Sequence, residues 1–152
     1  MKGIVFTEFL EMVEQKFGLE TLDNIIENGQ LPSEGIYTSV GTYEFNEMVT
    51  LITGLSEETK IPVGDLIYAF GLYLFAGLAN SHPEVIKNYN TPLGLLYCIE
   101  DHIHVHVKKL YPDAELPTFK ILDKTDNNIV MVYSSSRGLY RLAHGLIEKA
   151  FE

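Results

Sequence analysis

The sequence is poor in cysteine, in basic residues and in long apolar runs. Its 152 residues include one cysteine, Cys98, so no internal disulfide can form, which favours a reducing compartment. Lys and Arg number 11 against 21 Asp and Glu, and this acidic balance argues against nucleic acid and anionic membranes as partners. The longest apolar run, Leu66 to Ala79, is too short to span a bilayer. We therefore expect a soluble cytoplasmic protein.

The apolar residues follow a helical period over the first two-thirds of the chain. They make up 46% of the sequence, enough for a globular core, and the length fits a single domain over residues 1–152. Spacings of three and four residues predict helices over 6–17, 19–26, 43–55 and 63–79. The range 63–79 is apolar nearly all round, so we expect protein to surround that helix on every side.

The hydrophobic period changes after Leu116. Alternation predicts strands over 119–122 and 128–133, joined by a turn at Asp126-Asn127, and a final helix over 139–150. The sequence thus predicts an α+β fold. A helical N-terminal subdomain is followed by a small antiparallel sheet with a packed helix.

The run from Asp101 to His106 carries three histidines at alternate positions. On a strand, His102, His104 and His106 would share one face and could hold zinc or non-haem iron. Thr91-Pro92 is instead typical of a helix start, and we favour one helix reaching about Tyr111.

On that helix, His104 shares an inward stripe with Leu93, Tyr97 and Tyr111. His102 and His106 then form a solvated pair on roughly the opposite side. A lone interior histidine is more often a hydrogen-bonded core residue than a metal ligand, so position alone does not assign a role to His104.

A second polar pattern, Tyr133-x-Ser135-x-Arg137, ends the predicted second strand. Alternation puts the phenol, the hydroxyl and the guanidinium on one face, where they could cradle carboxylates. Taken alone, the pattern fits a polar strand end equally well. Haem would explain both patterns, because it needs an axial imidazole, an apolar slot and an anchor for two propionates. Helices around Phe9 and Phe75 could supply the slot.

Together these residues resemble the H-NOX (haem-nitric oxide/oxygen binding) family, in its bacterial stand-alone form. The motifs that carry the resemblance, in chain order, are Met1-Lys2-Gly3-Ile4-Val5, Ala69-Phe70-Gly71 through Leu78-Ala79, Asp101-x-Ile103-His104, Pro117 and Tyr133-x-Ser135-x-Arg137. The resemblance covers the whole chain. It also implies two further C-terminal strands, which this sequence lacks.

The resemblance implies haem b as cofactor, with His104 as the proximal iron ligand. It implies that Tyr133, Ser135 and Arg137 bind the propionates and that Pro117 presses on the haem. The distal pocket would be lined by Val5, Phe9, Leu74, Leu78, Leu142 and Leu146.

The six residues of the distal pocket bear on which gas the protein would bind. Oxygen-binding members of the family carry a tyrosine at the position that matches Leu142, whereas all six distal residues here are apolar. The resemblance therefore implies nitric oxide and carbon monoxide as ligands. It also implies a regulatory partner such as a histidine kinase or a cyclic-di-nucleotide enzyme, and no catalytic activity. A non-haem zinc or iron protein and a haem-free interaction domain are the alternatives.

Overall fold

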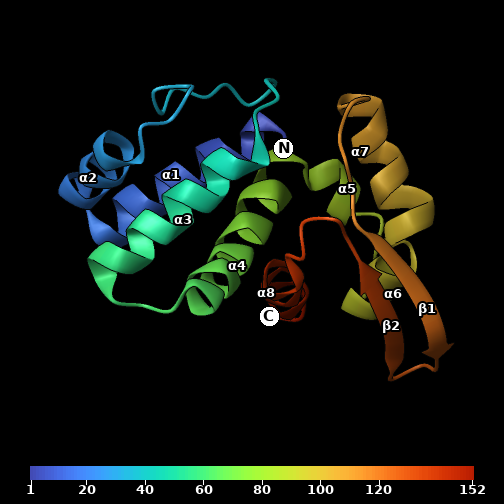
Figure 1. The fold of residues 1–152 in the computed structure, drawn as a ribbon. Coiled ribbons are helices and arrows are strands. Elements are labelled where there is room, and N and C mark those ends of the chain that lie inside the picture. The colour runs from blue at the N-terminus through green and yellow to red at the C-terminus, as the bar shows by residue number, and fades with distance from the viewer.

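The structure, a computed structural model, describes residues 1–152. Helices dominate it, and a two-stranded antiparallel sheet follows them (Figure 1), as the α+β prediction required. In chain order the elements are α1 (Gly3–Phe17), α2 (Leu19–Gly29), α3 (Phe45–Thr59), α4 (Val63–Ser81), α5 (Pro83–Ile86), α6 (Pro92–Tyr97), the π-helical turn η1 (Ile99–Ile103), α7 (His104–Leu110), β1 (Thr118–Lys124), β2 (Ile129–Ser134) and α8 (Tyr140–Ala150).

The first hydrophobic core lies among the four N-terminal helices. The sharp turn between α1 and α2 falls at Gly18, whose φ of 91° favours glycine. Helices α1, α3 and α4 bring their apolar stripes together, so that the side chains of Phe6, Phe9 and Leu51 are fully buried. Edge-to-face packing of Phe9 on Phe70, with ring centroids 5.2 Å apart, joins α1 to α4.

A second, smaller core joins the hairpin to the middle of the chain. Leu95, Leu96 and Ile99 are its buried residues, and side chains of β1, β2 and α8 pack against them. The strands pair with Phe119 opposite Tyr133, and a bulge interrupts the register between Ile121 and Asp123. Helix α8 lies between this unit and α4 (Figure 1), and therefore connects the two cores.

Helix α4 is less enclosed than its composition predicted. Four of its residues are buried, namely Leu66, Phe70, Gly71 and Leu74. The expectation of protein on every side was wrong, because one side of the helix borders a cavity. By length and composition α4 could cross a membrane. It packs against α1, α3 and α8, however, as the core helix of a helical bundle does.

Candidate functional site

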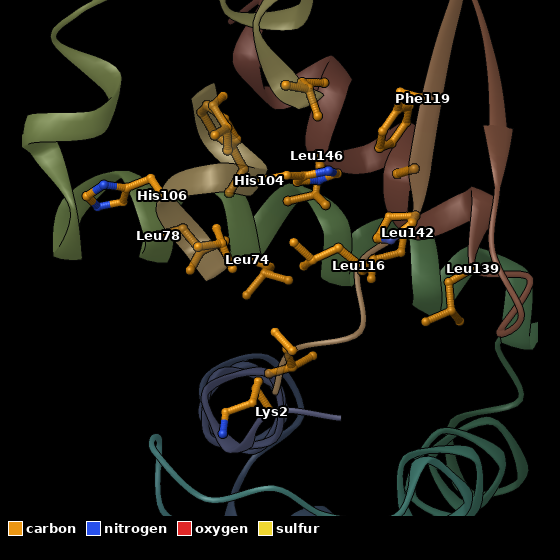
Figure 2. Close-up of a pocket in the computed structure, with 18 of the residues that line it drawn as sticks. Lys2, Leu74, Leu78, His104, His106, Leu116, Phe119, Leu139, Leu142 and Leu146 are labelled. Carbon is orange, nitrogen blue, oxygen red and sulfur yellow. The ribbon is translucent and has the colours of Figure 1, made fainter. Parts of the chain in front are cut away.

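An apolar cavity of about 370 Å³ lies between α4 and α8 on one side and α5, η1, α7 and the hairpin on the other. Of the 34 residues that line it, 26 are hydrophobic, so it suits a large apolar ligand. Figure 2 shows His104 pointing into this space, with Leu74, Leu142 and Leu146 on the facing wall. The cavity therefore brings most of the sequence-predicted site residues together.

The helix that carries His104 is not continuous. Thr91 caps α6 as predicted, because its Oγ1 accepts the Gly94 backbone N–H at 3.0 Å. The α-helical pattern then gives way to η1, where the Ile103 N–H donates to the Cys98 carbonyl five residues earlier. The prediction of one unbroken helix to Tyr111 was wrong at this point. Single π turns of this kind often occur at functional sites.

The π turn determines which residues share a stripe with His104. A π turn contains one extra residue, and each helical residue rotates the chain by about 100°. His104 is thereby aligned with Leu96 and Ile99, which line the cavity, rather than with Tyr97. Tyr97 lies off this stripe, and its hydroxyl donates to the Thr125 carbonyl in the hairpin turn. His104 faces inward as predicted. Of its predicted stripe, Tyr111 also lines the cavity, whereas Leu93 and Tyr97 do not.

Of the two neighbouring histidines, His102 is placed as predicted and His106 is not. His102 is exposed, with Nδ1 3.4 Å from the Tyr89 hydroxyl. The His106 side chain is 38% exposed, but it borders the cavity instead of lying on the opposite side. Its Nε2 is buried without a hydrogen bond, 4.0 Å from the Glu84 carboxylate. Figure 2 shows His106 at the edge of the cavity, away from the central position of His104.

A non-haem metal site finds no support in these side chains. The three histidines lie on a helical segment and not on a strand. No group of three or more His, Cys, Asp or Glu side chains is placed to hold a metal ion. An ion held by His104 would therefore need its other ligands from a source besides the protein side chains. A porphyrin, with its four nitrogens, is such a source.

Tyr133, Ser135 and Arg137 all line the cavity at its hairpin end, together with Pro117. Strand alternation is not what aligns them, because β2 ends at Ser134. A turn follows, in which the Arg137 backbone N–H donates to Ser135 Oγ at 3.1 Å and Gly138 takes a φ of 63°.

The Arg137 side chain is held in place at this rim. It is 17% exposed, donates to the Glu115 carbonyl at 3.3 Å, and lies 3.4 Å from the Glu115 carboxylate. Its guanidinium also stacks over the Phe45 ring at 5.6 Å. A fixed guanidinium at the mouth of an apolar slot suits a carboxylate-bearing ligand.

The wall that faces His104 is apolar. Val5, Leu74, Leu78, Leu142 and Leu146 line it, and none of these side chains can donate a hydrogen bond. The sixth predicted residue, Phe9, is not among the lining residues. It is fully buried behind this wall, in contact with Phe70.

Met1, Lys2 and Phe119 also line the cavity, although no sequence pattern predicted it. Met1 and Lys2 lie at its edge, where the N-terminal amine donates to the Tyr43 carbonyl at 2.6 Å. Burial, and then the charge of Arg137, lower the pKa of that amine. Phe119 packs beside His104 with ring centroids 6.0 Å apart. Phe119 begins the alternating pattern that predicted the first strand, but the pattern gave no sign of its contact with His104.

The chain is similar in sequence and in structure to proteins of one family. The family model described as Haem-NO-binding matches residues 2–152. The Fe(II) unliganded H-NOX protein from K. algicida shares 48% identity at a TM-score of 0.95, over 99% of this chain and 82% of that one. The H-NOX protein from S. oneidensis in the Fe(II)NO state shares 32% identity at a TM-score of 0.91, over 99% of this chain and 83% of that one.

The IWP-051-bound H-NOX from Shewanella woodyi in the Fe(II)CO state shares 44% identity at a TM-score of 0.85, over 98% of this chain and 78% of that one. No curated protein matches the sequence.

Proposed function

This chain belongs to the H-NOX family of haem-based gas sensors, and we propose that the gas it senses is nitric oxide. Haem iron is the cofactor, and the family is one of sensors rather than catalysts. When bound, haem supplies an iron centre that takes up diatomic gases. The residues of this chain would determine how haem is held and which gas is retained.

The observation that carries the proposal is the apolar wall opposite His104. Oxygen bound to iron is strongly polarised and is stabilised by a hydrogen-bond donor, whereas nitric oxide and carbon monoxide depend on one less. Leu74, Leu142 and Leu146 offer no donor. The solved relatives in the Fe(II)NO and Fe(II)CO states also support these two gases as ligands.

We assign the following roles within this proposal. His104 supplies the imidazole that ligates iron from one side of the cavity. Arg137, with Tyr133 and Ser135, binds the propionates at the hairpin end. Pro117 borders the cavity where it can press on the haem. Val5, Leu74, Leu78, Leu142 and Leu146 form the distal wall, and Phe9 supports that wall from behind.

Visible absorption spectra test the gas assignment. We expect the haem-loaded, reduced protein to show a strong Soret band that shifts with nitric oxide but not with air. Leu142→Tyr places a hydroxyl on the distal wall and should give a protein that retains oxygen in air. Leu142→Phe, which adds the ring without the hydroxyl, should not. Oxygen retention by the unaltered protein would overturn the assignment. The absence of a Soret band after haem addition would favour a haem-free interaction domain.

Replacement of single histidines tests the iron ligand. His104→Gly should abolish the wild-type spectrum of the reduced protein, and imidazole in solution should restore it. His106→Gly is the matched control, because His106 lines the same cavity at its edge, and it should retain the wild-type spectrum. The reverse result would assign iron to His106.

We further propose that the signal passes in the cytoplasm to a partner, either a histidine kinase or a cyclic-di-nucleotide enzyme. The supporting feature is the covalent link from His104 through α7 to the segment near Lys2, which a freely bound imidazole would lack. A candidate kinase should change its autophosphorylation rate when nitric oxide is added to the reduced protein. It should not do so with imidazole-restored His104→Gly. An unchanged response of that variant would exclude signalling through the helix.

A further inference from the structure

The carboxylate of Glu100 lies between His104 and the first strand. Glu100 belongs to η1, and its Oε1 is 3.3 Å from Nδ1 of His104. The same oxygen accepts the Phe119 backbone N–H at 2.6 Å. One carboxylate oxygen therefore contacts both the histidine that faces the cavity and the beginning of β1.

This carboxylate is held in a fixed position. Its bond to the Phe119 N–H anchors it to a strand, and the Phe119 ring packs against both His104 and Tyr133, with ring centroids 6.0 and 5.4 Å away. The His104 side chain is 16% exposed and the Glu100 side chain 40%, so the imidazole is the more enclosed of the two groups. A charged acceptor that is already oriented interacts more strongly than one that must first be ordered.

We propose that Glu100 is the positioning residue of His104. Its carboxylate accepts the Nδ1–H, which fixes the tautomer that leaves the Nε2 lone pair free to face the cavity. It also makes the imidazole a stronger donor to iron. This inference rests on the proposed role of His104 as the haem ligand.

Imidazole in solution, bound in place of the His104 side chain, allows the contact with Glu100 to be tested without a covalent link to the helix. In haem-loaded His104→Gly, imidazole carries an N–H that can reach Glu100, whereas 1-methylimidazole has no N–H to donate. We compare the dissociation constants of both ligands in His104→Gly and in His104→Gly/Glu100→Gln. Gln keeps an acceptor for the Phe119 N–H but removes the charge.

We expect Glu100→Gln to weaken imidazole binding roughly fivefold, the difference between a charge-assisted and a neutral hydrogen bond. The affinity for 1-methylimidazole should not change. An equal change for both ligands would show that Glu100 only shapes the cavity, and no change for either would show that it makes no such contact. Either result overturns the inference. If neither ligand binds, the ligand role of His104 fails and the inference fails with it.

A matched control comes from α8, where His144 and Glu148 form another pair four residues apart, with Nε2 and Oε2 separated by 3.6 Å. His144 does not line the cavity, so Glu148→Gln should leave both affinities unchanged. In the protein that retains His104, resonance Raman spectra supply a second readout. The iron–histidine stretching frequency should fall in Glu100→Gln and stay constant in Glu148→Gln. A constant frequency in both variants would contradict the proposed role.

Discussion

Gly71 of α4 and Gly145 of α8 lie directly against each other, with backbone touching backbone. A Cβ on Gly145 would stand 2.2 Å from the Tyr68 carbonyl oxygen and 2.9 Å from the Gly71 Cα. Neither is the end of a flexible side chain, so the contact can be relieved only by moving the two helices apart. Because α8 joins the two cores, this crossing fixes one side of the apolar cavity.

The first prediction concerns this crossing. Gly145→Ala should lower the free energy of unfolding by about 1–3 kcal/mol, since overpacking outweighs the roughly 1 kcal/mol that alanine gains in helix propensity. Gly54→Ala is the control. Its Cβ would stand 3.6 Å from Ile25, an ordinary contact, so this variant should gain stability. Urea denaturation measures the free energy of unfolding of both variants. Equal values for the two would contradict close packing at Gly145.

A second prediction follows from the contacts of Asp113, just beyond α7. Its carboxylate accepts the Thr42 hydroxyl at 2.5 Å and lies 3.1 Å from Lys2 Nζ. The Thr42 hydroxyl, followed by Lys2, holds the pKa of Asp113 below its ordinary value of 3.8. A depressed pKa stabilises the fold above pH 3.8, and this contribution is lost as the pH falls through the folded-state pKa.

Asp113→Asn should therefore lower Tm at pH 7, and the difference from the wild type should shrink towards pH 3. Asp126→Asn, in the exposed hairpin turn, provides the control and should leave Tm unchanged at both pH values. A difference for Asp113→Asn that persists undiminished at pH 3 would assign the effect to packing rather than charge.

The third prediction concerns the buried carboxylate of Glu47. Glu47 is 5% exposed, and its Oε2 accepts hydrogen bonds from the Tyr37 hydroxyl at 2.9 Å and the Ser33 backbone N–H at 3.3 Å. Tyr37→Phe keeps the ring but removes one donor, and should cost about 1–3 kcal/mol of stability. Tyr140 is 65% exposed, so Tyr140→Phe should change stability by less than about 0.5 kcal/mol. Thermal denaturation monitored by circular dichroism distinguishes the two.

The fourth prediction compares two arginines of the C-terminal region. Arg137→Gln removes the cavity-facing guanidinium and should weaken haem binding about tenfold or more, the range for hydrogen bonds to charged groups. Arg141 pairs with Asp65 at 3.2 Å outside the cavity, so Arg141→Gln should bind haem as the wild type does. Haem transfer to an excess of a haem-free acceptor protein measures both. Equal transfer from the two variants would remove Arg137 from the propionate site.

The sequence predicted the elements better than their orientation. Thr91-Pro92 identified a helix start because the cap is a local hydrogen bond, and the structure contains it. The π turn after Cys98 was not predictable from periodicity, because a 3.6-residue period has no signal for one extra residue. The position of His104 relative to Leu93 and Tyr97 depended on that residue, so these two were assigned wrongly to its stripe.

Other parts of the site depended on tertiary packing. The apolar composition of α4 could not distinguish burial by protein from contact with a cavity, and Phe9 was placed on the distal wall although it lies one layer behind. Arg137 was predicted at the site because strand alternation would put it on the same face as Tyr133. The strand ends three residues earlier, at Ser134. The Glu100 contact joins η1 to β1 and had no sequence signal.

The two cores differ in size, so the two sides of the cavity differ in how much a bound ligand would stabilise them. The N-terminal core buries 14 residues, whereas the core beneath the hairpin buries three, and the cavity lies beside both. A ligand that binds only the folded chain adds about 2.7 kcal/mol of stability at 100 times its dissociation constant. The hairpin side, with little burial of its own, depends most on that contribution. The cell's porphyrin and iron supply would thus set how much of the sensor survives proteolysis, before any gas is present.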